Sequence, residues 1–217
     1  MRDTMMNRPV SRAQFLRNSA KGAVALTVGG GVLASVQGVA MASGVSDNST
    51  LQAAYAAETL AVHVYKSVLA NFGKFAHPKL MNIDYFQKAL ADEQAHLAFL
   101  GSALGTKAPT GLTLQIPASA LKSGQAVLNF GVALETAFVE TYLGAVDTLS
   151  SHDLQLVAAK VGANEATHFS FFDAAAGGHG VLPALPSTVT VAQAATVLTP
   201  YIPNLTARLQ AAGFPNA

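Results

Sequence analysis

Two short stretches of this chain each place a glutamate and a histidine three residues apart, and this repeated pair constrains the fold more than any other feature. The pairs are Glu93 with His96 and Glu165 with His168. On an α-helix, side chains at this spacing lie on one face about one turn apart, so each pair can direct a carboxylate and an imidazole to the same point. Two such helices, with one more glutamate from each of two further helices, form a dinuclear metal site inside a four-helix bundle. The sequence therefore predicts an all-α four-helix bundle.

The two further glutamates are Glu58 and Glu135, and the composition supports their selection. The chain contains only five glutamates, and four of them fall in this pattern; the fifth is Glu140. Glutamate is therefore not being used here for ordinary solvated helix faces. The paired residues have apolar neighbours, such as Leu97 in one stretch and Phe169 in the other. Buried carboxylates without a partner cost several kcal/mol, so a bound cation is the natural compensation.

The spacing of the four glutamates about the predicted turns indicates that they share one level. The midpoint of the first two is 75.5, inside the turn signal at residues 71–78, and the midpoint of the last two is 150, at the start of the turn signal at residues 150–153. Residues equidistant from the turn of an antiparallel helical hairpin lie at the same height. All four carboxylates are therefore expected to lie level inside the bundle.

Helical periodicity, capping residues and helix breakers predict four long helices and a short fifth one. We expect them at residues 49–72, starting from Ser49 or Thr50, and at residues 82–104, 123–149, 151–176 and 191–198. Residues 106–122 are rich in Gly, Pro, Thr and Ser, and a loop of this length can cross more than the ~30 Å length of a 20-residue helix. Residues 43–180 are expected to form the bundle, and residues 181–217 an extension that packs on it or contacts another subunit.

Two segments resemble the exported bacterial ferritin-like domain family. They are residues 91–100 (ADEQAHLAFL) and residues 133–145 (ALETAFVETYLGA). The predicted site is more distantly similar to those of rubrerythrin, ribonucleotide reductase small subunits and manganese catalase. The likeness covers roughly residues 50–177 and includes all six candidate ligands. It implies a ferritin-like bundle of two antiparallel hairpins joined by a long crossover loop. Relatives often carry Asp-Glu-x-Arg-His in these helices, whereas Ala95 and Thr167 occupy the arginine positions here, so no role of that arginine is carried over.

The resemblance implies a centre of two iron ions or, alternatively, two manganese ions. Carboxylates and imidazoles without thiolates suit either metal. Glu93 and Glu165 are expected to bridge the ions, and Glu58 and Glu135 are expected to bind one ion each. Such a centre reacts with O2, peroxide or Fe(II), which implies a ferroxidase, peroxidase or catalase-like oxidoreductase. The non-enzymatic alternative is a stress or envelope protein in which the metal is a structural staple and the bundle an interaction module.

Four polar residues near the candidate ligands have two interpretations each. By resemblance, Asp92 and Asn164 accept the free ring N–H of the histidine on the opposite helix and fix its tautomer; otherwise they are solvated helix residues. Tyr65 and Tyr142 each follow a lone glutamate by seven residues, two turns along the same helix face. They are either core tyrosines with a bonded hydroxyl or residues that support the site, including a redox role.

The remaining glutamate and histidines are expected outside the ligand set. Glu140 and His63 each lie five positions beyond a lone glutamate, about 140° around the helix. Glu140 is expected at the surface or an interface, with a position at the pocket rim as the alternative, and His63 is expected to be packed. His77, His152 and His179 fall in predicted turns and are expected to be solvated.

Residues 1–42 have the pattern of an export signal. Four arginines and one lysine accompany a short apolar run at residues 22–36, and Ala40–Met41–Ala42 is a small-x-small cleavage site. Residues 11–17 (SRAQFLR) resemble a twin-arginine motif, but Ala13 replaces the second arginine, so the twin-arginine and general secretory routes both remain open. A retained membrane anchor is the alternative, although the run is short and contains three consecutive glycines. We expect a periplasmic or extracellular protein cleaved near Ala42.

Composition limits the partners of the remaining chain. Its 175 residues carry 8 basic and 11 acidic side chains without a basic run, so nucleic acid and anionic membranes are not expected partners and the mature domain is not expected to span a membrane. The absence of cysteine excludes disulfides, thiolate metal sites and iron–sulfur clusters. Charged residues make up 12% of the chain, which is low for a soluble monomer and favours a homo-oligomer.

Overall fold

The structure is a computed structural model that describes residues 45–75 and 81–214. The expected export segment at residues 1–42 and the predicted turn residue His77 lie outside the described residues. The described residues belong to one compact unit, Met41–Ala217. Their regular secondary structure consists of α-helices and short 3-10 turns, with no strand among them, which confirms the all-α prediction.

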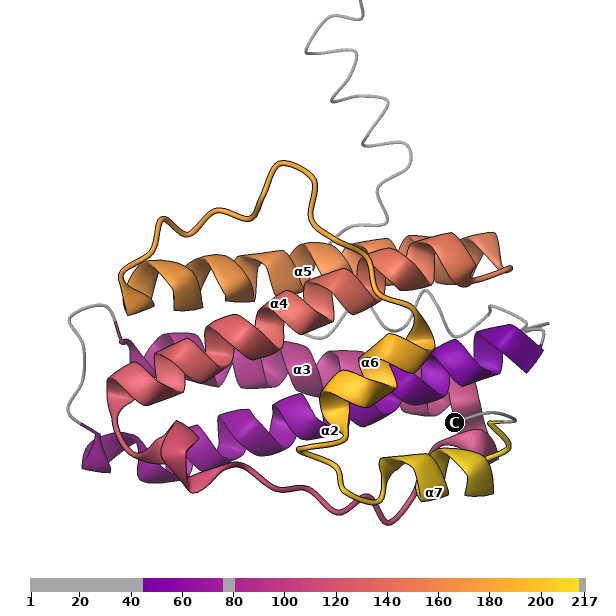
Figure 1. The fold of residues 1–217 in the computed structure, drawn as a ribbon, viewed down its shortest axis with the longest axis horizontal. Coiled ribbons are helices and arrows are strands. Elements are labelled where there is room, and N and C mark those ends of the chain that lie inside the picture. Colours follow the sequence, from indigo (N-terminus) through magenta and orange to yellow (C-terminus); the bar gives the residue numbers. More distant parts are fainter. Residues whose placement is uncertain (1–44, 76–80, 215–217) are drawn as a thin grey trace, which may run out of the picture. The chain divides into compact units, whose positions relative to one another are not determined.

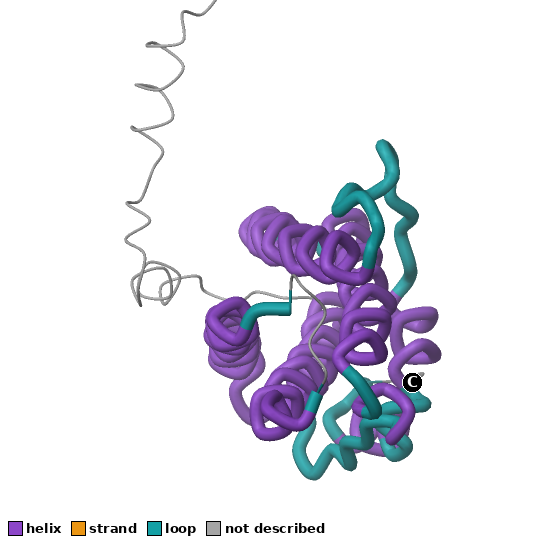
Figure 2. Tube along the Cα trace, turned by 90° about the vertical axis from the view of Figure 1, so that its left-hand side faces the viewer, coloured by secondary structure: helices purple, strands orange, loops and turns teal. Residues whose placement is uncertain are grey.

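Four long helices form a bundle of two antiparallel hairpins. They are α2 (Val45–Asn71), α3 (Ile83–Leu104), α4 (Gly124–Thr148) and α5 (His152–Ala176). Helix α2 packs along α3, α4 packs along α5, and the hairpins also meet between α2 and α4 (Figure 1). Figure 2 looks along the long helices, which surround a common interior. None of the described helices has both the length and the apolar character needed to span a bilayer.

Local capping chemistry explains why three of these helices begin and end where the sequence predicts. Side-chain oxygens of Asn82, Ser123 and Ser151 accept hydrogen bonds from backbone N–H groups in the first turns of α3, α4 and α5. Gly177 ends α5 with a φ of 105°, a left-handed conformation that favours glycine. The predicted bounds of α3, α4 and α5 are confirmed to within one residue.

The predicted start of the first helix is wrong, because α2 begins at Val45 and not at Ser49 or Thr50. Asp47 explains the extra turn. Its side chain is fully buried and accepts hydrogen bonds from the backbone N–H and hydroxyl of Ser150, both at 2.8 Å, and from the backbone N–H of Ser151 at 3.2 Å. This contact ties the first turn of α2 to the start of α5, and it joins residues too far apart for helix-capping rules to detect.

The crossover and the C-terminal segment lie together on one side of the bundle. Residues 105–123 contain two 3-10 turns, Gly105–Lys107 and Ala118–Leu121, and otherwise form the expected loop. The short helix α6 (Val191–Leu198) matches its prediction and packs against α2 and α4. A further helix, α7 (Leu205–Ala211), was not predicted. The side chain of Asn204 joins this segment to the crossover by bonds with the backbone of Thr113 and Gly111.

Candidate metal centre

The six predicted ligand residues lie in the middle of the bundle, between two apolar clusters. One cluster contains Phe72, Phe86 and Phe172 at one end, and the other contains Leu104 and Leu154 at the opposite end. Because both hairpins are antiparallel, the middle of every long helix reaches the level between these clusters. The equal spacing of the glutamates about the two turns therefore brings them together, as the sequence predicts.

The ligand atoms form two overlapping groups. The first group is Glu58, Glu93, His96 and Glu165, and the second is Glu93, Glu135, Glu165 and His168. Within each group, one ligand atom from every residue lies within 4.8 Å of the others. Two glutamates belong to both groups, and each group adds one glutamate and one histidine of its own.

The shared glutamates Glu93 and Glu165 each direct one oxygen toward each histidine. From Nδ1 of His96, Oε1 of Glu165 lies at 3.0 Å and Oε2 of Glu93 at 3.4 Å. From Nδ1 of His168, Oε1 of Glu93 lies at 2.9 Å and Oε2 of Glu165 at 3.3 Å. A carboxylate with its two oxygens in two ligand groups has the geometry needed to bridge two cations.

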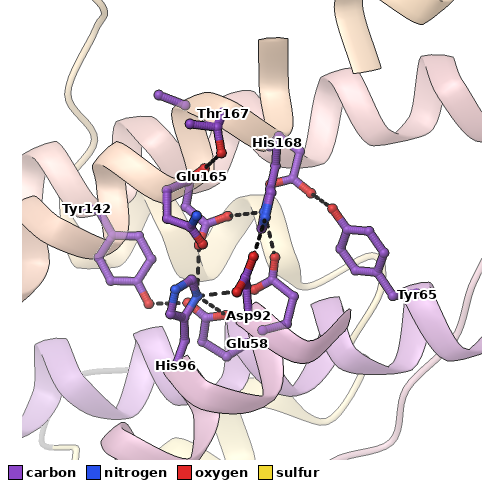
Figure 3. Close-up of polar contacts among 12 residues, drawn as sticks. Glu58, Tyr65, Asp92, His96, Tyr142, Glu165, Thr167 and His168 are labelled. Atoms are coloured by element: carbon purple, nitrogen blue, oxygen red, sulfur yellow. Dashed lines mark hydrogen bonds and ion pairs between the residues drawn. The ribbon is translucent and has the colours of Figure 1, made fainter. Parts of the chain in front are cut away.

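The other two glutamates, Glu58 and Glu135, each belong to one histidine. Oε2 of Glu58 lies 3.6 Å from Nδ1 of His96, and Oε2 of Glu135 lies 3.8 Å from Nδ1 of His168. Figure 3 shows Glu58 of α2, His96 of α3 and His168 of α5 converging on one region. Glu93 and Glu165 are thus shared between the two groups and Glu58 and Glu135 are not, whereas the bridging and terminal roles of these glutamates stay predictions.

Tyr65 and Tyr142 hold the two unshared glutamates in a reciprocal way. The hydroxyl of Tyr65 on α2 donates to Oε1 of Glu135 on α4 at 2.8 Å. The hydroxyl of Tyr142 on α4 donates to Oε1 of Glu58 on α2 (Figure 3). Each tyrosine thus follows one unshared glutamate along its own helix and bonds the other one across the bundle. The hydroxyl occupies one oxygen of each carboxylate and leaves the second oxygen directed toward the histidine.

A cation fits the remaining atoms of the cluster. The four glutamates are at most 1% exposed, and several buried polar atoms of the cluster make no hydrogen bond within the described residues. These atoms are Oε2 of Glu58, both carboxylate oxygens of Glu93, Oε2 of Glu135, Oε1 of Glu165 and Nδ1 of His96. Buried oxygen and nitrogen acceptors that converge without a donor need a cation or bound protons, because burying unpaired charge is costly.

Glu58, Glu93 and Glu135 have pKa values shifted from the usual range of a glutamate. Burial, followed by the neighbouring charge of Glu93, raises the pKa of Glu58 to about 7. Burial, followed by Glu165 and Glu93, raises the pKa of Glu135 well above its usual value. Burial and Glu165 would also raise the pKa of Glu93, but its contacts with the two histidines outweigh them and lower it. The unshared carboxyls therefore tend to hold protons while Glu93 stays ionised.

Both histidines hold protons more strongly than usual. Burial alone would lower their pKa values, but the surrounding carboxylates dominate and raise both, with Glu58 the largest of these influences on His96 and Asp92 on His168. Protons on the histidines and on the unshared glutamates thus replace the charge of a cation. A metal ion that bound here would displace these protons, so its affinity would rise with pH.

The predicted supporting residues Asp92 and Asn164 differ in what they contact. Oδ2 of Asp92 lies 3.7 Å from Nε2 of His168 on the opposite helix; these are the partners that the resemblance implies, but the separation is longer than a hydrogen bond. Asn164 holds the equivalent position on α5, but its Oδ1 is buried and accepts no hydrogen bond in the described part of the chain. The expected contact from Asn164 to His96 is not formed.

Four polar residues outside the ligand groups lie as the sequence analysis expects. Glu140 is half-buried on α4, where it lines a small cavity beneath α6, and it belongs to neither ligand group. His63 is half-buried on α2 and also lies outside both groups. His152 and His179 are exposed.

Tyr85 lies beside the site although it was not among the predicted site residues. Its ring stacks on Phe171 with centroids 3.4 Å apart and meets the ring of His168 edge-on at 6.2 Å. Its buried hydroxyl has no hydrogen-bond partner within the described residues. Tyr85 precedes Glu93 by eight residues on α3, so helical periodicity could have placed it near the face of the site.

Comparison with known families agrees with this geometry. The ferritin-like domain family matches residues 46–178, which is more than half of the chain. The chain belongs to the ferritin-like domain family. None of the curated proteins matches it.

The matched region of this ferritin-like domain includes the four long helices and the crossover. It stops at Gly178, close to the end of α5, so α6 and α7 lie outside it. Where relatives often carry an arginine, Thr167 is exposed and its hydroxyl donates to the backbone carbonyl of Asn164 at 2.7 Å (Figure 3). Ala95 offers no polar group at the other position.

Proposed function

We propose that this ferritin-like protein binds a dinuclear iron or manganese centre through four glutamates and two histidines, and that it is an oxidoreductase acting on O2, peroxide or Fe(II). One observation carries the proposal. Glu93 and Glu165 each direct one oxygen into each of the two ligand groups, while each group has its own glutamate and histidine. A site for a single ion would not need two complete groups that share two carboxylates.

Some residues would hold the ions, and others would isolate the ions from bulk water. Glu58 with His96 and Glu135 with His168 would each hold one ion, and Glu93 with Glu165 would hold both. Two bound iron or manganese ions would supply the electron exchange with O2 or peroxide. The apolar clusters on either side exclude bulk water. The side chains of His96 and Asp92 are 13% and 23% exposed, so the side of the site that they line offers small molecules access.

The donor set supports iron and manganese over softer metals. It contains carboxylate oxygens and imidazole nitrogens, and the chain has no cysteine. Thiolate and thioether ligands select copper(I) or zinc, whereas carboxylate and imidazole sites suit iron and manganese. We therefore expect protein from its native compartment to contain one of these two metals.

A second function follows from burial of the glutamates. Four carboxylates that are at most 1% exposed need compensation whether or not the site turns over a substrate. The metal would then serve as a staple that holds the two hairpins together in a stress or envelope protein. The burial favours metal binding in both cases, so a measurement of reactivity must separate them.

The separating experiment mixes anaerobic, Fe(II)-loaded protein with O2 or with peroxide and follows the absorption spectrum. If the protein is an oxidoreductase, its bound Fe(II) should be oxidised much faster than free Fe(II) in the same buffer. Glu165→Ala should abolish the acceleration, because it removes a ligand from both groups, and Glu140→Ala should retain it. Metal that binds tightly but oxidises no faster than free Fe(II) would contradict the enzyme and support the staple.

We also propose that the protein is exported to the periplasm or the extracellular space. The basic residues, the short apolar run and the small-x-small sequence within residues 1–42 support this proposal. Mass spectrometry of protein from outside the cytoplasm should find an N-terminus at Ser43. Intact Met1 on that protein would contradict cleavage.

A further inference from the structure

The two halves of the candidate centre have matching ligands. We rest on the proposed function and compare the surroundings of the two halves. Glu58 and His96 form one half, and Glu135 and His168 form the other, while the shared glutamates serve both. Each unshared glutamate accepts a tyrosine hydroxyl from the opposite hairpin. Ligand type and number therefore give no reason for the halves to bind metal unequally.

The residues behind the two histidines do give a reason. Nε2 of His168 faces the carboxylate of Asp92 at 3.7 Å, and Asp92 also pairs with Lys88 one turn earlier on α3. A carboxylate behind a metal-binding imidazole fixes the orientation of the ring and increases its basicity. We therefore expect the nearby carboxylate to orient the ring of His168, whose Nδ1 lies among the ligand atoms.

His96 lacks this support. The equivalent position is Asn164, whose amide is neutral and whose buried Oδ1 accepts no hydrogen bond in the described chain. Among the residues that the structure describes, the ion pairs of His96 all involve Nδ1, and Nε2 forms none. A ring without a partner on its second nitrogen is less firmly oriented and less basic than one with a carboxylate there.

The surroundings of the two rings differ in the same direction. The side chain of His96 is 13% exposed, whereas that of His168 is 3% exposed. The rings of Tyr65 and Tyr85 meet His168 edge-on with centroids at 6.0 and 6.2 Å. No aromatic ring in the described residues makes such a contact with His96. The ring of His168 is thus more closely packed than that of His96, which is slightly more exposed.

We infer that the two metal positions are unequal: the Glu135–His168 position binds first and keeps its ion, and the Glu58–His96 position binds second and exchanges its ion with solvent. Loss of a carboxylate behind a histidine ligand typically weakens metal affinity by about 10–100-fold, which sets the expected separation between the two positions. Asp92 is accordingly a positioning residue, because it acts through His168. In a protein that oxidises Fe(II), the His96 position is the one where substrate iron would enter and leave.

The test exchanges the two supporting residues. Metal-free protein is titrated anaerobically with Mn(II), with free Mn(II) measured by electron paramagnetic resonance, for wild type, Asp92→Asn, Asn164→Asp and the double exchange. Crystals grown with one equivalent of Mn(II) then show by anomalous scattering which position fills first. Asp84→Asn on α3 and Asn129→Asp on α4 make the same chemical changes at exposed positions and serve as controls.

Wild-type protein should bind Mn(II) in two steps. At one equivalent of Mn(II), the anomalous signal should lie beside His168. Asp92→Asn should bring the two steps together by weakening the tighter one about 10–100-fold. Asn164→Asp should strengthen the weaker step, and the double exchange should move the first ion to the His96 side. The controls should leave both steps unchanged.

Two other results would contradict different claims, the inequality of the two positions and the proposed function. Two equal steps in wild type, or first filling beside His96, would overturn the inequality and leave the dinuclear proposal standing. The absence of Mn(II) and Fe(II) binding in wild type would overturn the proposed function itself. The order of filling is a structural readout, so a variant that is merely less stable would not reverse it.

Discussion

The middle of the bundle and its two ends are equally buried but differ in their chemistry. At one end, Phe86 is fully buried and its ring lies 5.7 Å from those of Phe72 and Phe172. In the middle, Glu58 and Glu93 are just as buried and carry oxygens that make no hydrogen bond in the part of the chain that the structure describes. Apolar burial stabilises the fold whatever ions are present, whereas buried carboxylates destabilise it until a cation or protons compensate. The ends therefore hold the helices in place, and the middle depends on what it binds.

The largest expected effect comes from an apolar end. Phe86→Ala should lower the free energy of unfolding by about 3–5 kcal/mol, because it removes a fully buried aromatic ring and leaves a cavity. Chemical denaturation should show this loss in both metal-free and metal-loaded protein. Ile83→Ala, at a 40% exposed position on the same helix, should change it by less than about 0.5 kcal/mol. A loss seen only in the metal-loaded protein would contradict the conclusion that the apolar ends stabilise the fold independently of metal.

Metal should stabilise the protein through the middle alone. A ligand that binds only the folded state adds about 2.7 kcal/mol when its free concentration is 100 times its dissociation constant, so calorimetry of metal-free protein with added Fe(II) or Mn(II) should show a rise in Tm. His168→Ala should reduce this rise, because it removes a ligand from one group. Glu140→Ala should keep it. An unchanged Tm for wild type would show that the middle does not bind these metals.

The stability of metal-free protein should fall as pH rises from about 5 to 8. The pKa of Glu58 is about 7 in the folded protein against 4.5 for an ordinary glutamate, so its contribution is complete below about 4.5 and is lost as pH rises through 7. The raised pKa values of His96 and His168 act in the same direction above about 6.5, since the unfolded chain loses those protons first. The slope should be up to about 1.4 kcal/mol per pH unit for each proton.

Denaturation curves of metal-free protein at several pH values would measure this slope. Glu58→Gln should flatten it, because the amide does not titrate. The stabilisation by metal should show the opposite trend and grow with pH, as protons compete less for the ligands. Metal-free protein that gains stability between pH 5 and 8 would mean that Glu58 and Glu135 do not hold protons in the folded state.

The smallest effects should come from the tyrosines, where the presence of a hydrogen bond decides the outcome. Tyr65→Phe should cost about 1 kcal/mol, because it removes the 2.8 Å bond to Glu135 and leaves another buried oxygen without a donor. Tyr85→Phe should cost nothing or stabilise slightly, since the buried hydroxyl that it removes has no partner in the described chain. Thermal unfolding of the two variants, measured without metal, would test the difference. Equal losses would contradict it.

Much of the site could be predicted because helical geometry is local. A glutamate and a histidine three residues apart share a helix face in any α-helix, and equal distances from a turn bring residues of a hairpin to one height. The caps Asn82, Ser123 and Ser151 act within three residues of themselves, so the bounds of their helices could also be predicted.

The features that could not be predicted depend on contacts between distant parts of the chain. The first turn of α2 is held by Asp47 through residues more than 100 positions away. The tyrosines Tyr65 and Tyr142 were expected near glutamates, but their exchange of partners across the bundle depends on how the hairpins face each other. Asp92 and Asn164 differ only in a carboxylate against an amide. The consequence of that difference depends on the packing around each histidine, which the sequence does not show.

The central claim is that the six residues hold two metal ions, and anomalous X-ray scattering from crystals grown with excess Fe(II) or Mn(II) tests it most directly. The account predicts two peaks about 3.5–4 Å apart, as in other two-metal sites. Both peaks should lie between Glu93 and Glu165, with one beside Glu58 and His96 and the other beside Glu135 and His168. A single peak at the cluster, or peaks only elsewhere on the protein, would contradict the claim.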